Sequence, residues 1–257
     1  MLSIFNSSNL KEKKLLNVFL EKKIKRKFFN SSDINITKTR YLEKSSNQKL
    51  FQVSNIESFS KITSFHKKIL KFIKKNAKNY DIILAHDFGH GLFDQKIINI
   101  LEKYHKKIFV NVQTNSSNIG FNYITKYKNI SYFTIDEPEA RLAVQKKNDP
   151  IADVIKALKE KISFNIGCIT SGKNGAYIFD NNKIYYSPAL DSEPVDTLGA
   201  GDAFFAISSL FAAVNADPKI ISLMGNIAGA IKIKHLGHRK YIDKVTFLNY
   251  VKSYLNF

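Results

Sequence analysis

Residues 193–211 read EPVDTLGAGDAFFAISSLF, and the centre of this stretch is DTLGAGD at residues 196–202. Gly199 and Gly201 flank a single alanine, so the backbone can bend tightly there and leave its N–H groups uncovered. An apolar run follows directly and predicts a helix. The N–H groups and the dipole at a helix N-terminus attract anions. Asp202 places a carboxylate where these groups favour a phosphate, and a catalytic base is the role that best explains it.

A purely structural role is also open to these residues, because Asp and Thr commonly cap helices. The whole string Asp-Thr-x-Gly-Ala-Gly-Asp-Ala-Phe is intact, however, and it resembles the C-terminal signature of the PfkB (ribokinase-like) carbohydrate kinases. The resemblance covers residues 10–255 and is closest to the heptose-phosphate kinase branch, which includes the kinase domain of ADP-heptose synthase. It implies an α/β fold, namely a ribokinase-like three-layer α/β/α sandwich with a mostly parallel central sheet and a small β lid.

The composition of the chain is that of an ordinary globular protein. Its 257 residues are 44% hydrophobic and 24% charged, which suits one domain or at most two small ones. A single cysteine, Cys168, excludes an intramolecular disulfide and fits a reducing cytoplasm, where we expect the protein to work. The longest apolar tract, at residues 203–214, is too short to span a bilayer, so no membrane association is expected.

The net charge of +18 raises nucleic-acid binding as an alternative class of function. The lysines are spread over nearly every expected helix, and no RNA- or DNA-binding motif surrounds them. We therefore interpret them mainly as solvated faces that also attract anionic substrates. Nucleic acid as a partner rests on charge alone.

The hydrophobic pattern alternates between helical and strand spacing along most of the chain. Helices are expected at residues 9–27, 57–78, 95–105, 137–145, 151–161, 202–214, 218–236 and 243–255. Strands are expected at residues 34–42, 49–53, 81–85, 107–112, 132–135 and 164–170, with a hairpin at 176–179 and 183–186. Short apolar strands separated by amphipathic helices predict a parallel sheet that is covered on both faces.

Four polar loops follow strands of this predicted sheet, at residues 86–91, 111–113, 136–139 and 170–175. Ligands bind at the carboxyl ends of such strands, so the loops predict one site at that edge. The chain has neither a Walker loop nor a complete dinucleotide fingerprint. The identification of a kinase therefore rests on the resemblance.

Phosphoryl transfer needs a proton acceptor and donors for the charge on the transferred group. Asp202 is the predicted acceptor, and the backbone amides of Gly199, Ala200 and Gly201 are the predicted donors. Asp196 either steadies the turn or reaches the metal, and it is also a candidate for substrate binding.

The resemblance also implies ATP as the phosphoryl donor and assigns residues to it. The loop that begins at Thr170 matches a family loop that lies along the nucleotide, so Thr170, Gly172 and Gly175 are nucleotide-site candidates. A plain strand-to-hairpin turn is the alternative interpretation of that loop. Thr197, in the signature, is a further nucleotide candidate, and Asn226 falls where the family packs against the adenine.

A magnesium ion is the second cofactor that the resemblance implies. Asp136-Glu137-Pro138-Glu139 resembles the N-x-x-E element of the family, which acts on Mg²⁺ through water. Glu139 fits this element, whereas Asp136 stands where the family has Asn. A carboxylate can still serve a hydrated cation. An acidic helix N-terminus with Pro in its first turn is the alternative.

A histidine pair brackets the next candidate for the substrate site. His86 and His90 have a metal-like spacing, but a loop does not place them on one helical face, so zinc is not expected. The string Asp87-Phe88-Gly89-His90-Gly91 instead resembles the D-[YF]-G-[KH]-G loop of the heptose-phosphate kinases. In that resemblance Asp87 faces the sugar.

Residues 34–56 also resemble the heptose-kinase branch, where two strands form a lid over the substrate. Lys38 and Arg40 in the first of these strands are candidates for binding a sugar phosphate, because guanidinium groups match phosphate geometry. An ordinary cationic edge strand is the competing interpretation.

The resemblance is to the later part of a PfkB kinase. The glycine-rich sugar-binding segment that opens the family has no counterpart, so residues 1–257 are expected to form a single kinase domain that lacks this segment. A homo-oligomer or a partner chain is expected to supply the missing surface, and the branch implies a nucleotidyltransferase partner. The leading hypothesis is a sugar or sugar-phosphate kinase. The alternative is a truncated, catalytically weak nucleotide-binding subunit or interaction module of a sugar-activating complex.

Overall fold

The protein is described by a computed structural model that covers most of the sequence. The described residues are 1–5, 25, 27–30, 35–45, 49–57, 59–115, 118–191, 194–237 and 240–255. Contacts within the chain divide it into two compact units. The first is Met1–Phe72 with His90–Ile97, and the second is Ile73–Gly89 with Ile98–Phe257.

The first unit contains two small sheets. In one, β1 (Leu2–Phe5) pairs in parallel with β2 (Lys27–Asn30). In the other, β3 (Asn35–Leu42) pairs antiparallel with β4 (Lys49–Glu57), which confirms the two strands expected in this region. The helix expected at residues 9–27 falls largely outside the described residues. At its end the expectation was wrong, because Lys27 begins β2 instead.

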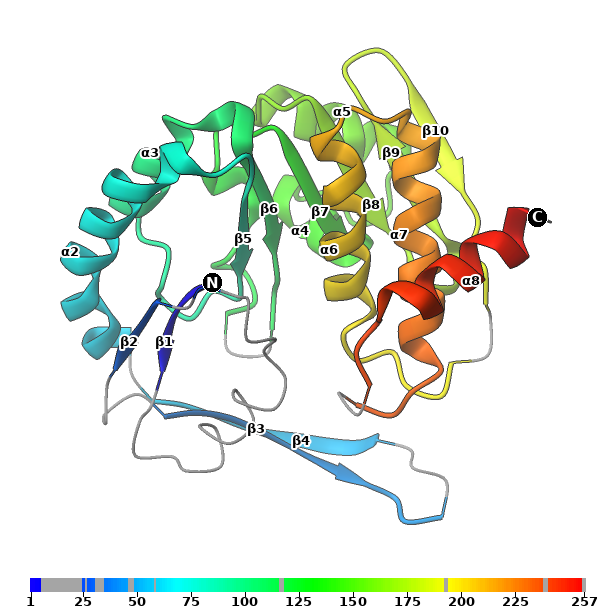
Figure 1. The fold of residues 1–257 in the computed structure, drawn as a ribbon, viewed down its shortest axis with the longest axis horizontal. Coiled ribbons are helices and arrows are strands. Elements are labelled where there is room, and N and C mark those ends of the chain that lie inside the picture. Colours follow the sequence, from blue (N-terminus) through cyan, green and yellow to red (C-terminus); the bar gives the residue numbers. More distant parts are fainter. Residues whose placement is uncertain are drawn as a thin grey trace. The chain divides into compact units, whose positions relative to one another are not determined.

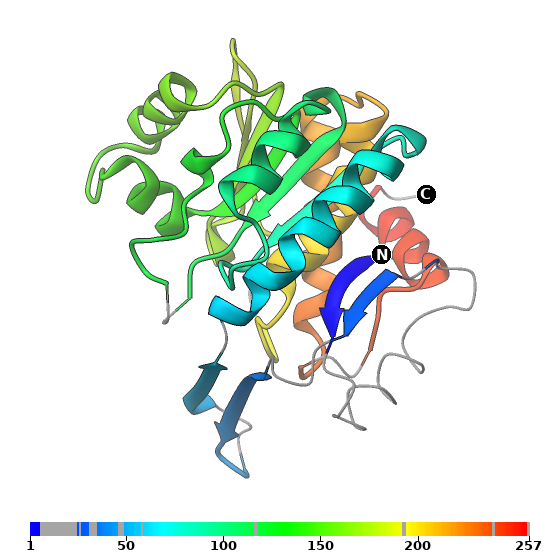
Figure 2. The same ribbon diagram turned by 90° about the vertical axis from the view of Figure 1, so that its left-hand side faces the viewer.

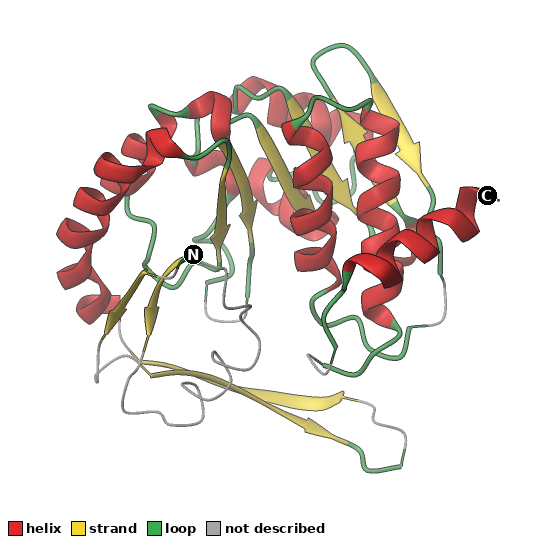
Figure 3. Cartoon of the chain, viewed as in Figure 1, coloured by secondary structure: helices red, strands yellow, loops and turns green. Residues whose placement is uncertain are grey.

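The second unit is built on a six-stranded sheet of order β10-β9-β8-β7-β6-β5. Its strands are β5 (Ile83–Asp87), β6 (Ile108–Val112), β7 (Tyr132–Asp136), β8 (Ile166–Thr170), β9 (Ala176–Phe179) and β10 (Ile184–Ser187). The strands from β5 to β8 are parallel, and the hairpin of β9 and β10 continues the sheet in antiparallel fashion. Figure 3 shows these strands in yellow.

Helices cover both faces of this sheet. The α-helices are α2 (Phe59–Asn76), α3 (Gln95–Glu102), α4 (Glu137–Val144), α5 (Ile151–Lys161), α6 (Ala200–Ala213), α7 (Pro218–Ile233) and α8 (Lys244–Leu255). Short 3-10 turns are η1 (Ala77–Asn79), η2 (His105–Lys107), η3 (Ile124–Lys126) and η4 (Gly172–Asn174). In Figure 1, α6 and α7 lie in front of the sheet and α4 and α5 behind it, and Figure 2 again separates the two pairs. The predicted three-layer α/β arrangement is confirmed.

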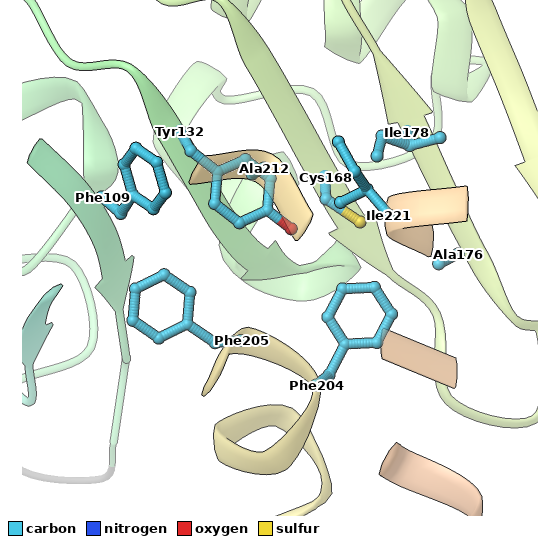
Figure 4. Close-up of a cluster of buried hydrophobic side chains, with 9 residues drawn as sticks. All are labelled: Phe109, Tyr132, Cys168, Ala176, Ile178, Phe204, Phe205, Ala212 and Ile221. Carbon is cyan, nitrogen blue, oxygen red and sulfur yellow. The ribbon is translucent and has the colours of Figure 1, made fainter. Parts of the chain in front are cut away.

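The core between α6 and the sheet fixes the position of the signature stretch. Phe204 and Phe205 point from α6 toward the strands (Figure 4). Phe205 lies beside Phe109 and Tyr132, and Phe204 lies beside Cys168 and Ile221 (Figure 4). The Tyr132 hydroxyl donates to Ser208 Oγ at 2.8 Å, so its polar end is also satisfied. Burying each phenylalanine contributes about 1.5–3 kcal/mol. The first turn of α6 is therefore anchored from below.

The middle of β8 carries the one cysteine of the sequence. Cys168 is fully buried in the same core, and burial raises the pKa of its thiol. As expected, it behaves as a small apolar side chain and not as a nucleophile.

Within the described ranges, none of the helices is both long and apolar enough to cross a bilayer.

Candidate active site

The signature stretch forms the N-terminus of α6. Gly199 is the N-cap in a left-handed conformation with φ of 78°, which favours glycine, and α6 begins two residues earlier than predicted, at Ala200. No side chain caps this end, although the Ala200 N–H donates to the Thr197 carbonyl at 3.2 Å. Gly201 has no positive φ, and a Cβ added there would meet nothing within 4 Å. Neither backbone nor packing requires a glycine at Gly201, which leaves an open approach to the first turn.

Asp196 ties the signature stretch to the chain that follows α7. Its Oδ1 accepts the Leu198 N–H at 3.0 Å, and its Oδ2 accepts the Gly237 N–H at 2.8 Å. The Gly237 carbonyl in turn accepts a hydrogen bond from the buried Lys232 ammonium. Asp196 thus steadies the turn, and its contact with substrate or metal stays a prediction.

Asp202 lies in the first turn of α6 with two polar neighbours from the sheet. Gln113 follows β6, and its Nε2 donates to Asp202 Oδ1 at 2.6 Å. His86 on β5 places Nδ1 3.8 Å from the same oxygen, and the two side chains are 34% and 38% exposed. Burial lowers the pKa of His86, and the Asp202 charge opposes that shift. The loops that carry Gln113 and His86 were predicted from the sequence, but their contacts with Asp202 were not.

A pocket of about 670 Å³ opens beside this turn, between α4, the loop after β8, α6 and α7. Its volume is typical of small-molecule sites. The predicted nucleotide-site residues all line it, namely Thr170, Gly172, Gly175, Thr197 and Asn226. Two predicted anion donors, Ala200 and Gly201, lie on its wall, and so does Asp136. The fold therefore gathers on one pocket wall residues that are far apart in the sequence.

The glycines around this pocket differ in what requires them. Gly175 has φ of 88°, and a Cβ there would lie 2.2 Å from the Ser187 carbonyl oxygen, so the turn itself requires glycine. Gly172 also has a positive φ, of 54°. In contrast, a Cβ on Gly229 of α7 would meet nothing within 4 Å and would enter the pocket. Gly229 was not predicted from the sequence, because its openness is visible only in the packed structure.

Asn226 is held at the end of the hairpin. Its Nδ2 donates to Ser187 Oγ at 2.9 Å and to the Pro188 carbonyl at 3.0 Å. The amide thus ties α7 to the segment after β10, and contact with an adenine stays a prediction.

The pocket lining includes an ion pair that was not predicted from the sequence. Arg141 binds Glu137 at 2.7 Å within α4, and Ser171 Oγ also donates to Glu137. Hydrogen bonds from Ser171 and Arg141 lower the pKa of Glu137. Lys173 is a further basic lining residue.

Asp136 and Glu139 form a capping box at the N-terminus of α4. Asp136 Oδ1 accepts the Glu139 N–H at 2.7 Å, and Glu139 Oε2 accepts the Asp136 N–H at 2.9 Å. Glu139 Oε1 also accepts the Thr114 N–H at 2.6 Å. Burial, with the neighbouring Asp136 charge, raises the pKa of Glu139 to about 7. Among the described residues no cluster of three or more metal-ligating side chains is found, so a directly bound ion has no ready-made cage there.

Asp87 is enclosed within the second unit. Only 2% exposed, it lies 2.5 Å from Lys126 Nζ, accepts the Tyr127 hydroxyl at 2.8 Å and accepts the Gly89 N–H at 3.0 Å. Burial, together with the Asp87 charge, raises the pKa of Tyr127. The carboxylate therefore organises its own loop. A contact with a sugar would require Lys126 or Tyr127 to move, and it stays a prediction.

Lys38 and Arg40 lie on β3 in the first unit, opposite Ser54 and Gln52. Two residues apart on a strand, they project from the same face of the ribbon. The lid role of β3 and β4 and the phosphate contact of these two side chains stay predictions.

Comparison with known proteins gives one family and a consistent fold. The family described as pfkB family carbohydrate kinase matches residues 94–244. The bifunctional protein HldE of Aliarcobacter butzleri (strain RM4018) is 32% identical over 181 residues, which are 67% of this chain and 36% of the relative. This chain spans about two fifths of the length of the curated relatives it matches.

Solved structures share the fold at low identity. Phosphofructokinase-2 from Escherichia coli, in complex with potassium, has a TM-score of 0.74 at 15% identity and covers 100% of this chain and 82% of its own. Arabidopsis thaliana ribokinase, complexed with ribose and ATP, has a TM-score of 0.73 at 14% identity and covers 98% and 81%. At such identities the likeness concerns the fold alone.

Proposed function

Because the chain belongs to the pfkB family of carbohydrate kinases, we propose that it transfers the γ-phosphoryl group of ATP to a hydroxyl of a sugar or sugar phosphate. The observation that carries this proposal is the pocket whose wall includes all five nucleotide candidates and ends at the turn that bears Asp202. The ribokinase that shares this fold was solved with ribose and ATP, which supports a sugar and ATP as the classes of ligand here.

Asp202 is proposed as the general base. It stands one residue from Gly201 on the pocket wall, and its 38% exposure leaves room for a substrate hydroxyl to approach. A base must come within hydrogen-bond reach of the proton that it removes. The hydroxyl oxygen then attacks the γ-phosphorus while its proton moves to the Asp202 carboxylate.

The amides of Gly199, Ala200 and Gly201 are proposed as the donors that stabilise the transferred phosphoryl group. The first N–H groups of a helix have no partner within the helix. Absence of a side-chain cap on α6 keeps this end available, and Ala200 would exchange its 3.2 Å bond to Thr197 for a phosphate oxygen. Each such donor is worth about 3 kcal/mol in the transition state.

Asp136 and Glu139 are proposed to hold Mg²⁺ through water. Their oxygens already accept N–H groups, so they suit a hydrated ion better than direct ligation. The raised pKa of Glu139 also fits, because a nearby cation would favour its ionised form. When bound, Mg²⁺ supplies positive charge to the phosphate oxygens.

The substrate is proposed to be a heptose phosphate or a related sugar phosphate, since the curated relatives are HldE proteins. Lys38 and Arg40 would bind its phosphate from β3 and β4 acting as a lid, with Asp87 and Asp196 near the sugar. Residues 1–257 would act as one kinase domain, in the cytoplasm. A second copy or a partner chain would complete the sugar wall, and the word bifunctional in the relatives' name supports a nucleotidyltransferase partner.

A second candidate function is a nucleotide-binding subunit with little activity of its own. One observation favours it, because within the second unit the pocket lining includes the nucleotide candidates but neither Asp87 nor Asp196. In that case ATP with Mg²⁺ would bind without sugar-dependent release of ADP.

The test is Asp202→Asn assayed for ADP release with ATP, Mg²⁺ and a panel of sugar phosphates. We expect turnover to fall by about 10² or more, because general-base catalysis contributes at least that much. Calorimetry of ATP binding and the thermal midpoint, both unchanged, would show that the site and fold persist. Parental turnover in Asp202→Asn would exclude the proposed base. ATP binding without turnover in the parent would favour the subunit.

A further inference from the structure

A chain of side-chain amides connects the centre of the sheet to Asp202. It starts at β7, where the Thr134 main-chain carbonyl accepts Asn111 Nδ2 at 2.9 Å. Asn111 Oδ1 then accepts Gln113 Nε2 at 3.1 Å, and the same Nε2 donates to Asp202 Oδ1 at 2.6 Å. Asn111 and Thr134 are 5% and 2% exposed, so this chain is shielded from water over most of its length.

The direction of every donor in this chain is set by its first member. A main-chain carbonyl can only accept, so the Asn111 amide must turn its nitrogen toward Thr134 and its oxygen toward Gln113. Gln113 must then present its nitrogen to Asn111. With its two N–H groups directed to Asn111 and Asp202, a flipped Gln113 would place its oxygen against two other oxygens.

The fixed direction has a consequence for the two oxygens of Asp202. Oδ1 receives an N–H and must act as an acceptor, and His86 Nδ1 lies 3.8 Å from that same oxygen. A proton on Oδ1 would face the Gln113 donor head-on. Oδ2 is therefore the oxygen that remains to take up a proton.

We propose that Gln113 is a positioning residue, which engages Oδ1 of Asp202 and thereby directs Oδ2 toward the acceptor hydroxyl. This inference rests on the proposed function. In the reaction, the substrate O–H bond breaks and its proton passes to Oδ2. The substrate oxygen forms a bond to the γ-phosphorus, the bond from that phosphorus to the bridging oxygen breaks, and ADP leaves with the electron pair.

Packing alone does not account for the last contact of the chain. Asn111 and Thr134 are buried polar groups and need their mutual hydrogen bonds. Gln113 satisfies the Asn111 oxygen with one N–H, so its second N–H is not required by the core. That second N–H meets a half-exposed carboxylate 89 residues away in the chain. The geometry therefore indicates that Gln113 has a role at the Asp202 carboxylate.

The first experiment compares Gln113→Met with the parent in steady-state kinetics across pH. Hydrogen bonds to charged groups are worth about 1.5–3 kcal/mol, so kcat should fall about ten- to hundredfold, with KM for ATP little changed. A donated hydrogen bond favours an ionised carboxylate, so the acid limb of the kcat/KM profile should move to higher pH. Gln113→Glu should move it further, because it places a second negative charge beside Asp202.

Gln95→Met is the matched control. It makes the same substitution at the first residue of α3, outside the chain of amides. Kinetics and pH profile should match the parent. A Gln113→Met variant that also matches the parent in kcat and in the acid limb would overturn the inference.

The second experiment does not depend on turnover. In the full ¹⁵N-labelled chain, the side-chain amide resonance of Gln113 is identified by its loss in Gln113→Met. Its shift should follow pH through the titration of a carboxyl group, and this dependence should disappear in Asp202→Asn. An amide resonance that titrates identically in the parent and in Asp202→Asn would overturn the contact.

The outcomes also separate this inference from the proposed function. If Asp202→Asn is inactive while Gln113→Met behaves as the parent, Asp202 remains the proposed base, and the positioning role of Gln113 is wrong. If Asp202→Asn turns over at the parental rate, the base and the positioning role both fall.

Discussion

Two helix N-termini in the second unit carry acidic residues but differ in whether side chains cap their N–H groups. At α4, the capping box of Asp136 and Glu139 occupies the N–H groups of the turn with the helix's own carboxylates. At α6, the N-cap is Gly199, and no side chain caps the turn that holds Asp202. The positive end of the helix dipole is thus met by capping carboxylates at α4 and by no side-chain cap at α6, as the proposed anion site requires.

The difference also separates stability from ligand binding. The acids of α4 hold the chain together, since Glu139 additionally holds the Thr114 N–H of the loop after β6. A Cβ added at Gly201 in α6 would meet no atom within 4 Å, and the same is true of Gly229, which also lines the pocket. Substitutions at the two ends should therefore have different signatures, in stability at α4 and in catalysis at α6.

The largest effect is expected for Gly201→Val, which would place a branched side chain over the open turn. The backbone N–H would remain, but the side chain would keep a phosphate oxygen from reaching the proposed donors. Losing the use of one such donor costs about 3 kcal/mol in the transition state, so turnover should fall by about 10²–10³. The free energy of unfolding should not decrease, because valine, although a weak helix former, still costs a helix less than glycine does. ADP release and urea unfolding are the two measurements.

Gly225→Ala is the control for this substitution. A Cβ on Gly225 of α7 would lie 2.6 Å from the Phe204 ring, so here the expected loss is in stability. If Gly201→Val destabilised the protein as Gly225→Ala does, the openness of the α6 turn would be the wrong explanation.

A smaller effect, on stability, is expected from Glu139→Gln as the pH changes. The folded protein holds the pKa of Glu139 at about 7, above its ordinary value of 4.5, so it binds the extra proton between those values. The parent should therefore lose stability relative to the variant as pH rises from about 4.5 to 7. After allowance for partial exposure, the expected change is about 2 kcal/mol.

Urea unfolding of both proteins at pH 5 and pH 8 measures this change. The difference between the two pH values cancels any cost of the substitution that does not depend on pH. A parent-to-variant difference that is equal at both pH values would contradict the shifted pKa.

The smallest effect is expected for Asp136→Ala, which opens the capping box of α4. Loss of an N-cap costs about 1 kcal/mol of stability. Asp217→Ala at the N-terminus of α7 is the matched control, because Asp217 Oδ1 accepts the Lys219 N–H in the same way. Only Asp136→Ala should also raise the Mg²⁺ concentration needed for half-maximal activity. An unchanged Mg²⁺ requirement would show that Asp136 caps the helix and does not help to bind Mg²⁺.

The periodicity of the sequence predicted most of the sheet and its helices. Helix α5 has the predicted bounds, and the hairpin of β9 and β10 lies within one residue of its predicted place. These elements have clear apolar spacing and clear turn residues. Strand β2 was missed because its four residues, KFFN, are too few to show the alternation of a strand.

The candidate site was predictable where residues are adjacent in the chain and not where they meet through the fold. The turn at Gly199 was predictable because consecutive residues form it. The partners of Asp202 and Asp87 are not, since Gln113 lies 89 residues from the first and Tyr127 lies 40 residues from the second. Such contacts depend on strand register and on helix rotation, for which a single sequence carries no local signal.

The single cysteine offers a built-in reporter of how the sheet opens. Cys168 is completely covered in the middle of β8, and its thiol reacts as a thiolate, which burial disfavours. A thiol reagent should therefore modify the native chain only when β8 separates from its neighbours. Under conditions where each opening leads to reaction, the labelling rate measures how often the central sheet opens. A nucleotide bound in the pocket would contact helices on both faces of the sheet, α4 on one and α6 and α7 on the other, and should therefore slow the labelling.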